Sequence, residues 1–283
     1  KHIANVLTLH NMPFMGADVR AILEQYRIQL AQTDLPEWAR VLPLPLGLWA
    51  SDAIVAVSPG YAGEVLTEEF GCGLNEFMSL RKETLSGILN GIDTVSFDPE
   101  TDKSISVNYT LETLDRRVEN KELLQEKLGL KRDPNVPLLA IISRMDVQKG
   151  VDLAFTALKN MKRIDFQAVI LGTGDPKLEE AARELQNLYP DKIKAELRFD
   201  AALARQIYAG TDMILMPSRY EPCGLAQMIA MRYGCVPVVR AVGGLKDTVI
   251  PNETGFVFEK AHHMSLVSAV KAALKVYPDR EKW

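Results

Sequence analysis

The chain has 283 residues, of which 47% are hydrophobic and 25% are charged, and its formal net charge is −4. These values are typical of a globular protein that is long enough for two domains. The negative balance argues against a surface for nucleic acid or anionic membranes. The three cysteines, Cys72, Cys223 and Cys235, are too few and too irregular for a disulfide framework, so they favour a reducing compartment.

No segment predicts a membrane span, a leader or a metal site. The most apolar stretch, residues 41–57, contains Pro43, Pro45 and Asp52, whereas a bilayer span needs about 20 uninterrupted apolar residues. No basic region followed by a cleavage site opens the chain, so we expect no signal peptide. No Cys/His cluster has the spacing of metal ligands, so we expect no metal and no cofactor.

Short apolar runs predict strands along the whole chain, with helical patterns between them. The predicted strands are Val6–Leu9, Ala53–Val57, Ile88–Leu89, Leu138–Ile142, Ala168–Leu171, Glu196–Phe199, Met213–Met216, Val236–Val239 and Gly255–Phe258. The predicted helices are Asn120–Leu128, Lys177–Leu188, Ala201–Ala209, Gly224–Tyr233 and Met264–Tyr277. The alternation between residues 138 and 277 is typical of a parallel, doubly wound sheet with helices on both faces.

The first third of the chain alternates in the same way but has too few strands for a whole open sheet. A polar stretch, Asp98–Tyr109, and a second break at Asp133–Pro137 are the two candidate boundaries. We favour the earlier one, because the helix at residues 120–128 fits the layers of the second domain. The sequence therefore predicts an α/β protein with an incomplete N-terminal domain, residues 1–95, and a C-terminal domain, residues 96–283.

The segment Pro217–Val249 is the most informative part of the chain. Glu221 follows a buried strand, Gly224 opens a helix, and Gly243 and Gly244 follow the next strand. Ligands of open α/β sheets bind beyond the carboxyl ends of the strands, and a glycine before a helix N-terminus suits a phosphate. This combination of a carboxylate and free backbone N–H groups predicts a site for a nucleotide sugar.

Two cations follow another strand in the string SRMDVQKG. Arg144 and Lys149 would lie at the same sheet edge and could hold a diphosphate. Both interactions would strengthen as charge develops on a diphosphate leaving group. The alternative is a solvated βα-loop. Gly172, in the turn LGTGD, is either part of a phosphate loop or a tight turn beside the site.

Three further positions have both a functional and a structural interpretation. His10 and Asn11 end the first strand, where a histidine could donate to a sugar hydroxyl or could simply be a structural residue. Asn90 reads first as a turn residue. Cys223 could be a thiolate nucleophile, but no base lies beside it in the sequence, so a small residue at a helix start is the preferred interpretation.

Taken together, these strings resemble bacterial glycogen synthases and plant starch synthases, glycosyltransferase family 5. The resemblance lies in SRYEPCGLAQMIAMRYG with VGGLKDTV, and in SRMDVQKG, LSGILNGID, SPGYAGEVLTEEFGCGL and VLTLHN, which occur in the order of the family. It covers nearly the whole chain. Many related enzymes with small acceptors have a second glutamate eight residues after the first, where this chain has Ile229, and this favours the glucan synthases.

The resemblance implies a GT-B fold, in which two Rossmann-like domains face each other across a cleft. It implies metal-free transfer of glucose from ADP-glucose, or from UDP-glucose as in some relatives, to the non-reducing end of an α-1,4-glucan with retention of configuration. It also implies a cytoplasmic protein or, for a plant protein, one in a plastid. No carboxylate pair of the glycosidase kind is evident, which suggests front-face attack by the acceptor hydroxyl.

The resemblance also implies roles for individual residues. Arg144 and Lys149 would neutralise the pyrophosphate, Glu221 would bind glucose hydroxyls, and His10 would contact the glucose from the other domain. The remaining expected donor contacts are Asn11, Asn90, Gly172, Phe199 against the nucleobase, Cys223, Gly224, Leu225, Gly243 and Gly244.

Three departures from the family pattern concern the ends and the first third. The chain starts beyond the family's glycine-rich KxGGL loop, is short and irregular between His10 and Ser51, and stops before the C-terminal helices. We therefore expect a partial chain that transfers glucose poorly or not at all. Two alternatives stay open: a GT-B transferase with a small sugar acceptor, and an inactive fragment that binds a nucleotide or a glucan. The oligomeric state is not predicted.

Overall fold

The computed structural model describes residues 3–279 and 281–283, and the chain divides into two compact units, Lys1–Asn90 and Gly91–Trp283. The boundary expected from the sequence, between Val95 and Ser96, lies five residues further along the chain.

The N-terminal unit contains a small parallel sheet of order β1-β2-β3. Its elements are β1 (Val6–Leu9), α1 (Arg20–Gln25), α2 (Pro43–Ala50), β2 (Ala53–Ala56), α3 (Pro59–Glu64), α4 (Asn75–Leu80) and β3 (Leu85–Gly87), with 3₁₀ turns at Glu37–Ala39 and Lys82–Thr84. Ser58 caps α3 by accepting from the N–H of Tyr61 at 3.0 Å. The Tyr61 hydroxyl in turn accepts from the N–H of Met12 at 2.7 Å and so fixes the loop after β1.

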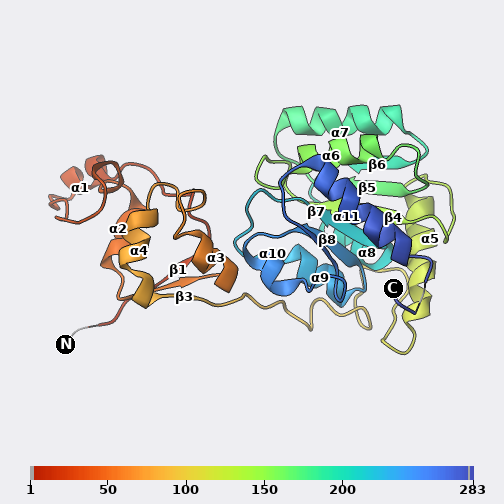
Figure 1. Cartoon of the computed structure of the whole chain (residues 1–283), viewed down its shortest axis with the longest axis horizontal. Coiled ribbons are helices and arrows are strands. Elements are labelled where there is room, and N and C mark those ends of the chain that lie inside the picture. Colours follow the sequence, from red (N-terminus) through yellow and green to blue (C-terminus); the bar gives the residue numbers. More distant parts are fainter. Residues whose placement is uncertain (1–2, 280) are drawn as a thin grey trace. The chain divides into compact units, whose positions relative to one another are not determined.

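The C-terminal unit contains a six-stranded parallel sheet of order β6-β5-β4-β7-β8-β9 (Figure 1). Its strands are β4 (Leu138–Ile142), β5 (Gln167–Leu171), β6 (Ile193–Glu196), β7 (Met213–Met216), β8 (Val236–Arg240) and β9 (Phe256–Phe258). Its helices are α5 (Arg117–Lys127), α6 (Val151–Asn160), α7 (Pro176–Leu188), α8 (Ala201–Gly210), α9 (Ala226–Arg232), α10 (Gly243–Thr248) and α11 (His263–Val276), with a 3₁₀ turn at Leu114–Arg116.

Helices cover both faces of this sheet, which explains its continuous apolar strands. Leu139 and Ile141 of β4 pack with α6, α7 and α11 in one core, while α8 packs on β4 and α9 on β7 and β8 from the other side. Because successive residues of a strand point to opposite faces, a strand covered on both sides is apolar at nearly every position, and the buried Gln167 of β5 is hydrogen-bonded. The predicted α/β class with a doubly wound second unit is confirmed.

A polar segment, residues 96–109, is bound to the C-terminal unit ahead of its first helix. Arg205 of α8 donates to Ser96 Oγ at 2.9 Å and pairs with Asp102 Oδ2 at 3.1 Å. The hydroxyl of Tyr233 also donates to Asp102, and the hydroxyl of Tyr109 donates to the carbonyl of Tyr233 at 2.9 Å. The segment that the sequence marked as a candidate boundary is therefore part of the second unit's surface.

Several predicted elements differ from the structure. The strand predicted at Ile88–Leu89 is wrong, because β3 ends at Gly87 and Ile88 is 61% exposed. The strand predicted at Glu196–Phe199 overlaps β6 only at Glu196, because the buried residue that anchors β6 is Ile193. Helix α9 begins at Ala226 rather than Gly224. The sequence prediction missed α6 and α10 and the helices of the first unit, and it read Gly243 and Gly244 as a turn.

Candidate functional site

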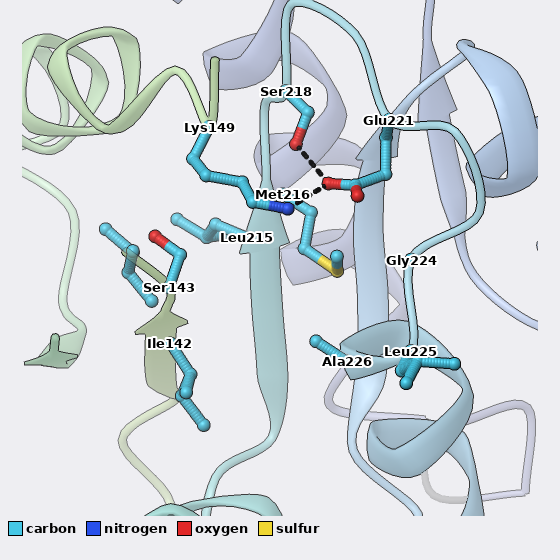
Figure 2. A pocket seen from close by; sticks show the side chains of 11 residues that line it. Ile142, Ser143, Lys149, Leu215, Met216, Ser218, Glu221, Gly224, Leu225 and Ala226 are labelled. Carbon is cyan, nitrogen blue, oxygen red and sulfur yellow. Dashed lines mark hydrogen bonds and ion pairs between the residues drawn. The ribbon is translucent and has the colours of Figure 1, made fainter. Parts of the chain in front are cut away.

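The strand order of the C-terminal unit places a crevice between β4 and β7. These two strands are neighbours, and the chain leaves them toward opposite sides of the sheet, so the loops at their carboxyl ends separate. A cavity of about 140 Å³ lies at this point. Its lining residues are Ile141, Ile142, Ser143, Lys149, Leu215, Met216, Ser218, Glu221, Gly224, Leu225 and Ala226 (Figure 2).

A buried carboxylate and a lysine meet in this cavity. Lys149 Nζ lies 2.6 Å from Oε2 of Glu221, and the hydroxyl of Ser218 donates to the same oxygen at 3.1 Å (Figure 2). The Glu221 side chain is 6% exposed and that of Lys149 is 21% exposed. Both contacts go to Oε2, so Oε1 is available to accept a hydrogen bond from a ligand. The ammonium has two N–H groups beyond the one that pairs with Glu221.

The loop that contains Lys149 is organised by Asp146. One oxygen, Oδ1, accepts from the backbone N–H of Lys149 at 2.9 Å, and the other lies 3.2 Å from Nη2 of Arg144. The Arg144 side chain is 63% exposed. The structure therefore brings the two predicted cations together in one loop, and Lys149 lines this cavity.

The backbone around Cys223 is packed against the start of α10. Gly244 donates its N–H to the carbonyl of Glu221 at 3.1 Å, and a Cβ on Gly244 would lie 2.3 Å from the carbonyl oxygen of Cys223. Only glycine permits this approach. The side chain of Gln227, which is fully buried, donates to the carbonyls of Cys223 and Gly224 at 3.1 and 3.0 Å. These contacts tie the backbone at Cys223 and Gly224 to helix α9.

A second cavity, of about 240 Å³, adjoins the first through Ile142 and Ser143. It is lined by Ile142, Ser143, Arg144, Leu171, Gly172, Thr173, Arg198, Phe199, Asp200, Ala201 and Ala204. Phe199 is 86% exposed. Two predicted donor contacts, Gly172 and Phe199, are thus placed in one apolar hollow beside Arg144, which could hold a flat ring.

The predicted residues of the N-terminal unit lie at its sheet and just after it. His10 and Asn11 directly follow the carboxyl end of β1, where His10 is exposed. The side-chain oxygen of Asn11 is a buried atom without a hydrogen-bond partner. Asn90 is half-buried and ends the unit.

Sequence reasoning missed several residues of the site. Ser218 and Asp146 bond directly to the predicted groups, and Gln227 holds the loop at Cys223. Ser218 and Asp146 lie three residues from Glu221 and Lys149 respectively, so a search for polar neighbours within each loop could have found them. Among residues 3–279 and 281–283, no three His, Cys, Asp or Glu side chains gather as metal ligands would.

Two family models match the chain. Residues 120–283 match glycosyl transferases group 1, and residues 1–80 match the starch synthase catalytic domain. The first match covers more than half of the chain and contains both cavities. Fold and site therefore define a glycosyltransferase.

Three glycogen synthases illustrate the similarity of sequence. Those of Streptococcus sanguinis, Streptococcus mutans and Clostridioides difficile are 42%, 43% and 39% identical over 299, 297 and 294 residues. The matches cover 100%, 99% and 100% of this chain but 62%, 61% and 61% of those proteins. The chain thus spans about three fifths of the length of these relatives.

Solved structures show the same fold. The catalytic domain of starch synthase IV from Arabidopsis thaliana, bound to ADP and acarbose, aligns with a TM-score of 0.87 and 34% identity over 96% of this chain and 59% of that one. A sucrose-phosphate synthase from Thermosynechococcus elongatus aligns with a TM-score of 0.64 over 96% of this chain and 59% of that one; at 21% identity it shows the fold alone. The chain has the GT-B type of fold and belongs to the family of glycogen and starch synthases, glycosyltransferase family 5.

Proposed function

We propose that this chain contains the donor site of a retaining glucosyltransferase that moves glucose from ADP-glucose to the non-reducing end of an α-1,4-glucan. The observation that supports this most is the shared oxygen of Glu221, which receives Lys149 Nζ and the Ser218 hydroxyl at the crevice between β4 and β7. Both Glu221 and Lys149 line the cavity. The second Glu221 oxygen, Oε1, would accept a hydrogen bond from a sugar hydroxyl, and the remaining N–H groups of Lys149 would bind a phosphate.

The two cavities fit the two ends of such a donor. The nucleobase would lie on Phe199, beside Gly172, and the diphosphate would cross Ile142 and Ser143 to reach Arg144 and Lys149. The glucose would then lie against Glu221 and the backbone of Cys223, Gly224 and Leu225, with Gly243 and Gly244 behind them. The related starch synthase IV, whose structure holds ADP and acarbose, supports a nucleotide and a saccharide as ligands.

The reaction would depend on stabilising the leaving group. As the glycosidic bond to phosphate breaks, negative charge develops on the diphosphate, and Arg144 and Lys149 would interact more strongly with it than with the bound donor. An acceptor hydroxyl would attack on the same face and pass its proton to the departing phosphate oxygen. His10, Asn11 and Asn90 are the groups that we expect the N-terminal unit to contribute to the glucose.

The proposal includes an α-glucan as the acceptor and a reaction in the cytoplasm. Within the described residues, no helix has the length and the apolar character needed to cross a membrane. The acceptor is tested by comparing glycogen with small sugars.

Elongation of glycogen from ADP-glucose by this chain tests the proposal, and calorimetry with ADP separates binding from transfer. Because the chain spans 62% of its relative in Streptococcus sanguinis, a second outcome is ADP binding without transfer, which would favour the nucleotide-binding fragment. Transfer to small sugars but not to glycogen would favour the transferase with a small acceptor. Absence of both binding and transfer would contradict the proposal.

A further inference from the structure

The two loops that hold the proposed donor groups are joined by one arginine. Arg219, two residues before Glu221, donates its backbone N–H to the carbonyl of Gln148 at 2.7 Å and its Nη1 to the carbonyl of Val147 at 2.7 Å. Its guanidinium also forms a bidentate pair with Asp152 of α6, in which Nη1 donates to Oδ1 at 2.8 Å and Nη2 donates to Oδ2 at 2.7 Å. The loop after β7 is therefore attached to the loop after β4 and to the helix that follows it.

The backbones of the two loops touch where this attachment occurs. Gly150 has a φ of +64°, and a Cβ there would lie 2.1 Å from the carbonyl oxygen of Pro217. The amide of Gln148 donates to the carbonyl of Tyr220 at 3.3 Å. These contacts surround the Lys149–Glu221 pair, so a shift of one loop along the other would change the distance between the two charged groups.

We propose that Arg219 and Asp152 are positioning residues that set the register of these loops, and thereby hold the Glu221 carboxylate against Lys149 at the sugar end of the donor. Both side chains lie outside the two cavities, so they would act through Glu221 rather than on the ligand. The planar guanidinium fixes orientation as well as distance, because it binds both carboxylate oxygens at once.

The charge state of the pair suits this role. The hydrogen bond from Arg219 lowers the pKa of Asp152, outweighing the effect of burial, so the carboxylate stays ionised throughout the neutral range. The two side chains are 32% and 41% exposed, and such a pair contributes little to global stability. Loss of the pair should therefore change the site more than the fold.

The proposal rests on the proposed function for the identity of its ligand, and the intact chain tests it. Calorimetry with ADP and with ADP-glucose would compare wild type with Arg219→Ala, Arg219→Lys and the exchanged pair Arg219→Asp/Asp152→Arg. The matched control is Arg132→Ala, which breaks another partly exposed ion pair, Arg132–Glu122 at 2.8 Å, outside both cavities.

We expect Arg219→Ala to bind ADP-glucose about tenfold more weakly, a change of about 1.4 kcal/mol, while ADP affinity stays within about twofold, because the diphosphate groups belong to the other loop. Arg219→Lys should lose part of the effect and the exchanged pair should regain part. Arg132→Ala should change neither affinity. Unchanged binding in Arg219→Ala, or equal losses for both ligands, would overturn the proposal.

If wild type binds neither ligand, the proposed function fails and the positioning role is decided in the free protein. Hydrogen exchange at residues 143–150 and 217–225 would then be compared at matched thermal stability. Faster exchange in both loops of Arg219→Ala, but not of Arg132→Ala, supports the role of the pair. Exchange like that of wild type rejects it.

Discussion

The two sheets of this molecule differ in how far their strands are covered. In the C-terminal unit all five residues of β5 are buried. In the N-terminal unit, by contrast, β1 has four residues, of which only Leu9 is buried, and Val6 is 65% exposed. β5 has a strand on each side and helices on both faces, while β1 is an edge strand. The loops at the carboxyl edge of the larger sheet therefore start from fixed positions, and this is the edge where the Lys149–Glu221 pair forms.

The difference indicates how the two units would share the work of transfer. Every residue that lines the two cavities belongs to the C-terminal unit, so we expect nucleotide binding to depend on that unit. We expect the N-terminal unit to supply His10 and Asn11, and we expect these residues to affect the sugar and not the nucleotide. Five changes test these expectations, from the largest expected effect to the smallest.

Replacing Lys149 with methionine should have the largest effect, because the buried Glu221 carboxyl would lose the cation that it pairs with. We expect glucose transfer to fall by about 10³-fold and the free energy of unfolding to fall by about 3 kcal/mol, measured by glycogen elongation and by urea denaturation. Lys149→Met/Glu221→Gln should regain much of the stability and none of the transfer.

The matched variant in the other unit is His10→Ala. Since His10 is exposed at the end of β1, we expect ADP affinity within about twofold of wild type and little change in stability, while transfer falls. A large loss of ADP affinity in His10→Ala would break the contrast between the units.

Truncation of a core residue should show the difference between the sheets directly. Ile170 of β5 is fully buried and Val6 of β1 is 65% exposed. We expect Ile170→Ala to lower the free energy of unfolding by about 3 kcal/mol and Val6→Ala by less than about 0.5 kcal/mol, both from urea denaturation. Equal losses at the two positions would contradict the difference in coverage.

The fourth effect depends on pH and concerns the carboxylate of Asp102. Burial would raise the pKa of this carboxyl, but hydrogen bonds from Tyr233, from the N–H of Ser104 and from Arg205 outweigh burial and lower it below 3.8. Its contribution to stability is therefore complete above pH 3.8 and is lost as the pH falls through the lowered value. Asp102→Asn should be less stable than wild type by about 2 kcal/mol at neutral pH, and the difference should narrow below about pH 4. A difference that stays constant down to pH 2 would rule out an ionised Asp102.

The smallest expected effect is a difference in how fast Cys72 and Cys235 react with an alkylating reagent. Burial raises the pKa of Cys235 in the C-terminal unit to about 12, and its side chain is fully buried. Cys72 in the N-terminal unit is half-buried, and burial also raises its pKa. Since the thiolate is the reactive form, iodoacetamide should label Cys72 first and Cys235 only after unfolding. Mass spectrometry of the wild type would show which cysteine is labelled first, and Cys72→Ser should lack the early label. Labelling of Cys235 before Cys72 would contradict the prediction.

Apolar runs located the central strands of the larger sheet well, because strands covered on both faces are apolar at nearly every position. The bounds of β4 and β7 agree with their predictions. The edge strands were harder to place. For β3, Ile88 suggested a strand by its side chain, but the ladder with β2 ends at Gly87, where a Cβ would lie 2.4 Å from the backbone of Pro59. For β6, Phe199 was counted as a strand residue although it lies exposed beyond the end of the strand.

The site shows a similar limit. The sequence placed Lys149 and Glu221 after two apolar strands, but these residues are 72 positions apart. Their contact depends on β4 and β7 being neighbours, which hydrophobic periodicity does not specify. The pair Arg219–Asp152 was missed for a related reason. Each residue alone is predicted to be a solvated surface charge, and the two come together where Gly150 approaches Pro217.

The segment 96–109 matters for anyone who would recombine such enzymes. It falls between the two family matches, which end at residue 80 and begin at residue 120, so a chimera designed on those limits would assign it arbitrarily. Its side chains recognise Arg205 and Tyr233 of the C-terminal unit. A crossover after residue 110 would supply these partners from a foreign sequence, whereas a crossover near Asn90 would transfer the segment together with the surface that it fits.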